Sequence, residues 1–237
     1  NELDNLKKVS NDVFGEENFL ESFIWIKKTN PPNNVVVGSV HEYIICYTKN
    51  KAQSKLYLLP RNKSESTNFK NPDNDPRGKW VSGDLSAAAN GGRSTPSLLY
   101  DIKNPFTGNR IWWGADKKGK PKYKRFLSEV RDGFSISTLL DDVGNNGTAS
   151  KELNKILNDI AVFETPKPIK MLYKISQIST KSNDIILDFF SGSASTAHGV
   201  MALNAEDGGN RKHIQVQLPE PTGDKSEAYK SGYKTLT

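Results

Sequence analysis

Toward its C-terminal end the chain reads Ile185-Ile186-Leu187-Asp188-Phe189-Phe190-Ser191-Gly192-Ser193-Ala194-Ser195. The first six residues are typical of a buried strand, and the Ser/Gly turn after them is typical of a connection to a helix. Gly192 can adopt backbone angles that are closed to other residues, and Ser193 or Ser195 can cap the helix that follows. The stretch therefore predicts a strand, a tight turn and a helix in succession.

Regular patterns on both sides of this turn indicate the fold class. Upstream, two segments each place apolar residues on one helical face: Leu153, Ile156, Leu157 and Ile160, then Met171, Leu172, Ile175 and Ile178. Downstream, a helical pattern from Ala197 to Leu203 is followed by a strand from His213 to Leu218. Helix, strand, glycine turn, helix and strand in this order predict an α/β fold with a parallel, doubly wound sheet.

Such a turn has two interpretations. In open α/β sheets, ligands bind beyond the carboxyl ends of the strands, and the Asp188 carboxylate can accept hydrogen bonds from a ligand amine or hydroxyl. An ordinary strand-to-helix turn with a capping serine has the same spacing, so the spacing alone leaves both interpretations open.

The first sixty residues have shorter patterns. Leu3, Leu6, Val9 and Val13 have helical spacing, and strand-like runs follow at Phe23 to Ile26, Tyr43 to Tyr47 and Leu56 to Leu59. Cys46 lies in the second run, so we expect a buried strand thiol and not a nucleophile. Because the chain opens inside or at the edge of a helix, we expect a fragment of a longer protein.

Composition excludes some classes of protein. The 237 residues include one cysteine, which permits neither an internal disulfide nor a cysteine-based zinc site, and no histidine has a partner at metal-ligand spacing. No apolar run approaches the about 18 residues of a membrane span, and no signal peptide is evident. Because one cysteine cannot form an internal disulfide, we expect a protein of the reducing cytoplasm. The net charge of +6 and the pI of about 9.2 favour a polyanionic partner.

Several motifs, in order, carry a resemblance to a known family. The turn resembles the first cofactor motif of amino-methyltransferases, Asp-x-Phe-x-Gly-Ser-Gly-Thr-Thr, and Thr165 to Pro168 resembles their Thr-x-Lys-Pro element. Further segments resemble the Mod subunits of type III restriction–modification systems: Val13 to Phe19, His41 to Ile45, Arg110 to Trp113, Tyr123 to Val130, Leu203 to Lys212 and Val216 to Glu220. Together they cover nearly the whole chain.

The resemblance implies a Rossmann-like methyltransferase sheet that transfers a methyl group from S-adenosylmethionine to adenine N6 in double-stranded DNA, after the base has been extruded from the stack. It implies these cofactor-binding residues: Asp188, Phe189, Phe190, Gly192, Ser193, Thr165, Lys167, Pro168 and Gln217. Three positions depart from the pattern. Ala194 and Ser195 stand where many relatives have glycine and threonine, and Gln217 stands where many have an acidic residue for the ribose hydroxyls, although an amide can still bond a hydroxyl.

The family's catalytic tetrapeptide, Asp-Pro-Pro-Tyr, does not occur in the chain. Asn30-Pro31-Pro32-Asn33 lacks the aromatic residue and lies downstream of Phe14-Gly15-Glu16-Glu17, a segment that already follows the catalytic motif in Mod subunits. We interpret it as a loop, since Asn and Pro favour turns. We therefore assign no catalytic residue, and expect the chain alone to be inactive.

The resemblance also divides the chain. Residues 1–59 and 147–237 are expected to belong to the methyltransferase core, and residues 60–146, which are loop-rich, to an inserted target-recognition region. We expect a basic run there to contact DNA phosphates through Lys117, Lys118, Lys120, Lys122, Lys124 and Arg125. The nearby aromatics Trp112, Trp113, Tyr123 and Phe126 can contact a groove or a base, or they can belong to a solvated hairpin in which the tryptophans are buried. A Mod homodimer and a restriction (Res) subunit are the expected protein partners.

Two other classes of function stay open. The chain can be a non-catalytic DNA-binding or subunit-docking module that retains a decayed methyltransferase fold. A nucleotide-binding oxidoreductase is disfavoured because the turn does not read Gly-x-Gly-x-x-Gly.

Overall fold

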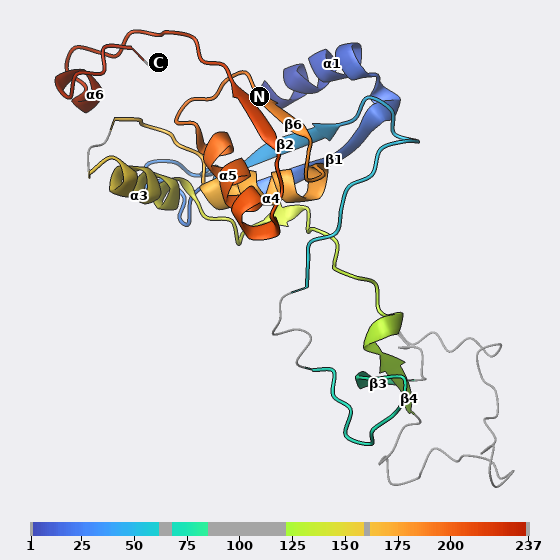
Figure 1. The fold of residues 1–237 in the computed structure, drawn as a ribbon. Coiled ribbons are helices and arrows are strands. Elements are labelled where there is room, and N and C mark those ends of the chain that lie inside the picture. Colours follow the sequence, from blue (N-terminus) through green and yellow to red (C-terminus); the bar gives the residue numbers. More distant parts are fainter. Residues whose placement is uncertain (1, 62–67, 85–121, 159–161, 236–237) are drawn as a thin grey trace, which may run out of the picture. The chain divides into compact units, whose positions relative to one another are not determined.

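The structure is a computed structural model that describes residues 2–61, 68–84, 122–158 and 162–235 (Figure 1). The chain forms two compact units, one made of residues 1–59 with 135–237 and the other of residues 60–134. Each is described by itself.

The larger unit has its core on an antiparallel hairpin. β1 (Phe19–Ile26) pairs with β2 (His41–Tyr47) from Phe19↔Tyr47 to Ile26↔His41, and its other edge pairs in parallel with the short β5 (Leu139–Leu140). Alternate residues of β1 face inward, so Phe23 and Trp25 are buried. Met171 and Ile178 of α4 (Ile169–Ser179) pack against them and complete the core.

A parallel strand–helix–strand segment follows α4. β6 (Ile185–Asp188) pairs with β7 (Lys212–Gln215), from Ile185↔Lys212 to Asp188↔Gln215, and α5 (Ser195–Asp207) connects the two strands. α5 lies beside α4 (Figure 1). Gly199 permits this approach, since a Cβ there would lie 2.8 Å from the backbone nitrogen of Tyr173.

A buried arginine fixes the start of β7 to both helices. The Arg211 guanidinium donates to Thr180 Oγ1 at the end of α4 (2.9 Å) and pairs with Asp207 at the end of α5 (2.8 Å). The side-chain amide of Asn204 donates to the backbone carbonyl of Arg211 and accepts a hydrogen bond from its backbone N–H. Because the side chain of Arg211 is only 5% exposed, these bonds satisfy a charge that would otherwise be costly to bury.

In the described part of this unit, the other α-helices are α1 (Glu2–Phe14), α3 (Asn146–Ile156) and the short α6 (Glu227–Lys230), and a 3-10 helix spans Glu16–Asn18. The side chain of Asn145 caps α3 by accepting the N–H of Thr148. The C-terminal segment folds back on itself. Pro221 and Thr235 form an isolated antiparallel β-bridge, the N–H of Thr222 donates to the carbonyl of Lys234, and the hydroxyl of Thr222 donates to the carbonyl of Tyr233.

The smaller unit is built on two antiparallel strands, β3 (Trp80–Asp84) and β4 (Lys122–Phe126). Phe126 is 1% exposed, and the guanidinium of Arg77 lies 4.1 Å from its ring centroid. Lys124 pairs with Asp73 and, at 2.7 Å, with Asp75, which also pairs with Arg77. This charge network links β4 to the segment that precedes β3.

The helices and strands predicted around the glycine turn are present, with shifted ends, but the prediction that the first strand is buried is wrong, because Ile185 and Leu187 on one face of β6 are exposed. β6 ends at Asp188, because Phe189 and Phe190 already belong to the turn, and β7 ends at Gln215 and not at Leu218. The strand predicted over Leu56 to Leu59 is wrong: the segment forms no strand beyond a single β-bridge at Leu59, although Leu59 is buried. Asn30 to Asn33 is a loop, as predicted, and Cys46 lies half-buried in β2, where burial raises the pKa of its thiol.

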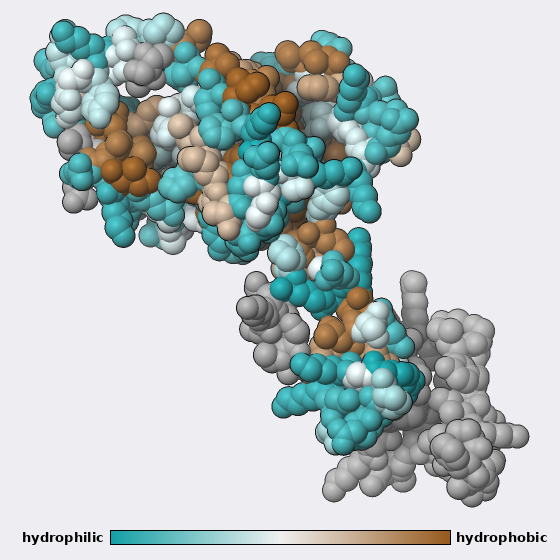
Figure 2. Space-filling view, viewed as in Figure 1, coloured by the Kyte–Doolittle hydropathy of each residue, from teal (hydrophilic) through white to brown (hydrophobic). Residues whose placement is uncertain are grey.

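The described strands form three separate sheets, with orders β2-β1-β5, β3-β4 and β6-β7, so one continuous doubly wound sheet is not formed among them. One face of the β6–β7 pair exposes Ile185, Leu187, Ile214 and Val216, and Figure 2 shows apolar surface in this region.

Within the described residues, no helix is long and apolar enough to cross a membrane, and no cluster of side chains has the composition of a metal site.

Candidate cofactor pocket at the glycine turn

The carboxylate of Asp188 holds the turn closed. Its Oδ1 accepts the N–H of Phe190 at 3.1 Å, and its Oδ2 accepts the hydroxyl of Thr196 at 2.6 Å. Thr196 lies in the first turn of α5 and is buried. Asp188 therefore fixes the end of β6 relative to the start of α5, across the loop that connects them.

Gly192 and Ala194 both have left-handed backbone angles, with φ of 50° and 58°. A Cβ at Gly192 would lie 3.0 Å from Cζ of Phe163, so a side chain there would crowd Phe163 and would also have to adopt the left-handed conformation that glycine adopts most easily. The N–H of Gly192 donates to Oε1 of Gln217 at 2.8 Å, which ties the turn to the segment after β7. Ala194 carries the strain of a left-handed non-glycine residue.

The turn borders a pocket of about 460 Å³ inside the larger unit. Gly192, Ser193 and Ser195 form one side of it, together with Lys167. Most other walls are apolar and come from α3, α5 and the segment before α4: Leu153, Ile156, Leu157, Val162, Phe163, Ile169, Ala197 and Met201. Polar groups thus lie around the turn, and an apolar lining forms the rest, an arrangement typical of small-molecule sites.

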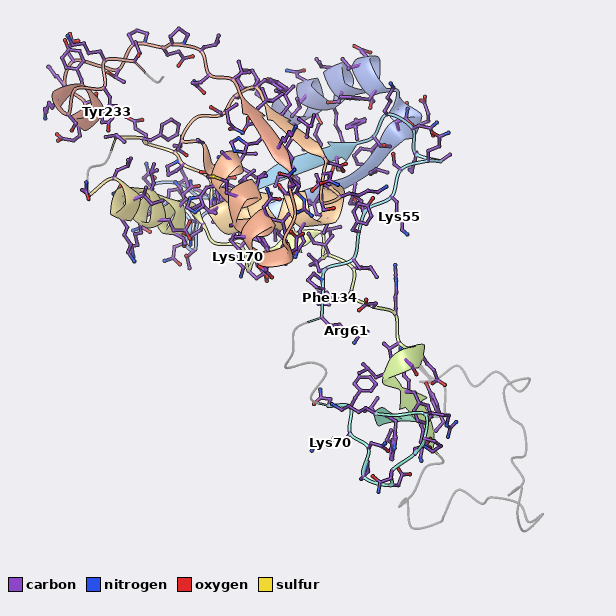
Figure 3. All side chains as sticks on the ribbon, viewed as in Figure 1. Lys55, Arg61, Lys70, Phe134, Lys170 and Tyr233 are labelled. Atoms are coloured by element: carbon purple, nitrogen blue, oxygen red, sulfur yellow. The ribbon has the colours of Figure 1, made fainter. Side chains whose placement is uncertain are left out.

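The C-terminal segment supplies the remaining wall. Thr222, Ala228, Tyr233 and Thr235 line the pocket, and Figure 3 shows Tyr233 beside α6. The backbone N–H of Tyr233 donates to the carbonyl of Ala228 at 2.9 Å, which holds this wall in shape. Neither this wall nor His198, which also lines the pocket, was predicted as part of the site. No local motif marks them.

Lys167 reaches the pocket from the segment before α4, which is fixed by two fully buried prolines, Pro166 and Pro168. Its Nζ lies 3.3 Å from Oε2 of Glu42 on β2 and 5.1 Å from the centroid of the buried Trp25 ring. The other oxygen of Glu42 pairs with Lys27 at 3.0 Å.

Glu42 is consequently a carboxylate shared by two ammonium groups. Partial burial raises the pKa of Glu42, but the hydrogen bond from Lys27 and the charge of Lys167 outweigh burial, so its pKa lies below the ordinary value. Glu42 therefore stays ionised near neutral pH. This link between β2 and the pocket was missed by the sequence analysis.

The predicted cofactor residues fall into three groups. Gly192, Ser193 and Lys167 line the pocket. Asp188, Phe189 and Phe190 line a separate hollow of about 300 Å³ against α4, and both phenylalanine rings are exposed. The remaining three, Thr165, Pro168 and Gln217, line neither: Thr165 is exposed, Pro168 is the N-cap residue of α4, and Gln217 accepts the N–H of Gly192.

The predicted DNA-contacting residues are only partly described. Lys117, Lys118 and Lys120, like Trp112 and Trp113, lie outside the described residues, and Lys122 begins β4. Two others can be located on β4. Arg125 is exposed, whereas Lys124 is held by Asp73 and Asp75, whose hydrogen bonds raise its pKa. Phosphate contact by these residues stays a prediction.

Comparison with known proteins gives the family. Residues 1–216 match the family described as DNA methylase. The whole chain is 32% identical to the Mod subunit of the type III restriction-modification enzyme StyLTI of Salmonella typhimurium, of which it spans 39%. It is 29% identical to the EcoP15I Mod subunit of Escherichia coli and 27% identical to the type II methyltransferase M.KpnI of Klebsiella pneumoniae, and it spans 44% and 64% of these proteins.

The chain thus spans about two fifths of the length of the two Mod subunits. The family match, by contrast, covers nearly all of the chain, including β6, the glycine turn and Lys167. This chain belongs to the DNA methylase family.

Proposed function

We propose that this chain is part of an adenine-N6-specific DNA methyltransferase of a type III restriction–modification system, with S-adenosylmethionine as the methyl donor. The observation that carries the proposal is that the Gly192 turn and Lys167, which are far apart in the sequence, line one pocket of about 460 Å³. The similarity to Mod subunits over the whole chain supports the same conclusion.

The residues of the pocket suit S-adenosylmethionine in chemical character. Its apolar walls, such as Phe163 and Ile169, suit a purine, and the hydroxyls of Ser193 and Ser195 can bond polar groups. The Lys167 ammonium is a partner for a carboxylate. Gly192 leaves room beside Phe163 that a side chain would fill. When bound, the donor supplies an electrophilic methyl group on a sulfonium; the chain binds and orients it.

Asp188 and Gln217 act in this proposal as positioning residues. Asp188 bonds the two ends of the turn, and Gln217 holds the N–H of Gly192, so both keep the pocket side of the turn in shape. Phe189, Phe190, Thr165 and Pro168 remain proposed cofactor residues on the resemblance alone. The family's Asp-Pro-Pro-Tyr tetrapeptide does not occur in the 237 residues, so we assign no group of this chain to the target base.

Further parts of the proposal concern the whole enzyme. We propose that the β6–α5–β7 segment belongs to a Rossmann-like sheet, since its parallel strands and helical connection are the repeating element of that fold and one face is exposed and apolar. Double-stranded DNA is the proposed substrate, read by residues 60–146. A second Mod subunit and a Res subunit are the proposed partners, and the cytoplasm is the proposed location.

Calorimetric titration of the 237-residue chain with S-adenosylmethionine tests the proposal. We expect saturable binding by the wild type and its loss in Gly192→Val, because the new side chain meets Phe163 and the backbone is left-handed. Gly208→Ala is the matched control. Gly208 is also left-handed, at φ 69°, but it ends α5 away from the pocket and has no atom within 4 Å of a Cβ.

Two outcomes oppose the proposal. Folded wild-type protein that does not bind the cofactor would overturn the site, and if the same protein bound DNA, the non-catalytic module would become the better account. Equal binding by wild type and Gly192→Val would show that the cofactor lies elsewhere. Asp188→Ala is expected to weaken binding without abolishing the fold.

A further inference from the structure

The loop between β1 and β2 presents three consecutive valines to solvent. Val35, Val36 and Val37 are 48%, 103% and 88% exposed, and the last two are the most exposed large apolar side chains in the described part of the chain. Isolated apolar residues on a surface need no explanation, but three adjacent branched side chains held away from the core do. The loop tip therefore has the character of a contact surface.

The loop is held in shape by its own packing. Gly38 lies against the two prolines, since a Cβ there would come within 2.6 Å of Pro31 Cβ and 2.7 Å of Pro32 Cδ. At its base, the backbone N–H groups of Lys27 and Lys28 both donate to the carbonyl of Val40. A tip that projects from so constrained a base loses little conformational entropy when it is buried by a partner.

The charge of the loop favours a polyanion as that partner. From Lys27 to Val40 the sequence contains two lysines and no aspartate or glutamate. Lys28 is exposed, whereas Lys27 is paired with Glu42. An apolar tip with a basic residue, Lys28, on its N-terminal side and no nearby acidic residue in the loop suits duplex DNA, whose phosphates attract cations while the space between base pairs accepts apolar side chains.

The base of the loop shares its anchors with the cofactor pocket. The N–H of Asn146, the first residue of α3, donates to the carbonyl of Lys27, and Asn145 bonds the hydroxyl of Thr29 at 3.3 Å. Figure 1 shows the loop beside α3, a helix that lines the pocket. Glu42 connects Lys27 to Lys167, which lines the pocket as well. The valines thus project from the same framework that would hold the methyl donor.

We propose that Val35–Val37 is an apolar wedge that inserts into the DNA base stack next to the target adenine. The inference rests on the proposed function, because a base that is to be methylated at N6 must leave the stack. Unstacking costs free energy, and apolar side chains that enter the gap offset part of that cost. The wedge raises the population of the extruded base without touching the reacting atoms.

The test compares two duplexes of the same sequence, one intact and one with a single abasic site, by fluorescence anisotropy in the presence of S-adenosylmethionine. We expect the wild-type chain to bind the abasic duplex about tenfold more tightly, because its gap is already open. The triple variant Val35→Ser, Val36→Ser, Val37→Ser is expected to bind both duplexes equally. Val13→Ser, which removes a 67% exposed valine from α1, is the matched control and should keep the preference.

Calorimetry with S-adenosylmethionine separates the wedge from the proposed function. If wild type and triple variant both bind the cofactor and both prefer the abasic duplex, the wedge is overturned while the proposed function stands. If the wild type binds cofactor but the triple variant differs only in self-association, measured by sedimentation, the tip is a protein interface and the wedge is overturned too. Absence of cofactor binding by the wild type overturns the proposed function first, and the wedge with it.

Discussion

Oε2 of Glu42 on β2 lies 3.3 Å from Nζ of Lys167, a residue 125 positions further along the chain. The pair connects the β1–β2 hairpin to the pocket at the glycine turn, with the Trp25 ring beneath the ammonium group. Both side chains are more than two fifths exposed, so the pair contributes at most about 1 kcal/mol to folding. Its main consequence is therefore for the pocket and not for stability.

We predict that Glu42→Gln weakens the binding of S-adenosylmethionine by about threefold to tenfold, or about 1 kcal/mol. The amide no longer holds Lys167 in place. The substitution also removes a negative charge near S-adenosylmethionine, a ligand that carries two positive charges and one negative charge. Isothermal titration measures the change. S-adenosylhomocysteine, which lacks the sulfonium charge, should lose less affinity, and Lys27→Gln, which leaves the Glu42–Lys167 pair intact, should change little. Equal losses for both ligands would contradict the electrostatic part of this explanation.

The left-handed backbone of Ala194 leads to a second prediction. We expect Ala194→Gly to stabilise the protein by up to about 1 kcal/mol, because relief of about 1–2 kcal/mol of strain exceeds the entropy that glycine adds to the unfolded chain. Ala202→Gly within α5 is the matched control and should destabilise by about 1 kcal/mol, because Ala202 has ordinary helical angles. Urea unfolding measures both free energies. If both substitutions changed the free energy of unfolding in the same direction, Ala194 would not be strained.

The phenol of Tyr173 gives a prediction about alkaline pH. Burial and the hydrogen bond to Glu206, 2.6 Å long, raise the pKa of Tyr173 to about 12 from the ordinary value of 10.0. A group whose pKa is raised by folding contributes stability that is fully present below its unfolded pKa and is lost as the pH rises through the folded pKa. This contribution is therefore intact at neutral pH and disappears between about pH 10 and pH 12.

Tyr173→Phe should remove that dependence. We expect the free energy of unfolding of the variant to fall less between pH 10.0 and pH 12 than that of the wild type, and its tyrosinate absorbance to lack one late transition. Gln177→Ala, which removes a weaker partner of the same hydroxyl, is the control and should keep the transition. Loss of the late transition in the control as well would assign it to another tyrosine.

Elements set by local sequence were predictable. The apolar periodicity of Ile169–Ser179 and the strand–glycine–helix order at Asp188 to Ser195 depend on residues within one or two turns of each other, and both are found in the structure. The end of β6 was not predictable from hydrophobicity, since Phe189 and Phe190 continue the apolar run. It is set by the Asp188 side chain, which bonds the N–H of Phe190 and closes the turn.

Contacts between distant segments were not predictable. Strand pairing depends on which segments meet in space. The sequence pattern therefore did not indicate that β1 would pair with β5 in one sheet while β6 and β7 pair in a separate sheet. The same holds for the pocket. Gly192 and Lys167 were identified from motifs, but the wall formed by Tyr233 and the bond between Glu42 and Lys167 join segments that no motif connects.

The smaller unit permits a test of which basic residues on β4 contact DNA. Lys124 is engaged by Asp73 and Asp75, whereas Arg125, its neighbour on the opposite face of the strand, is exposed. We therefore expect Arg125→Gln to weaken DNA binding for all sequences and to reduce the slope of log affinity against log salt by about 1, because one phosphate contact is lost. Lys124→Gln should leave the slope unchanged and instead speed hydrogen exchange of the β3–β4 amides, because it leaves two carboxylates without their shared partner. Anisotropy titrations over a range of salt concentrations measure the slopes. A reduced slope in Lys124→Gln with unchanged hydrogen exchange would mean that Lys124 leaves its carboxylates and binds phosphate in the complex.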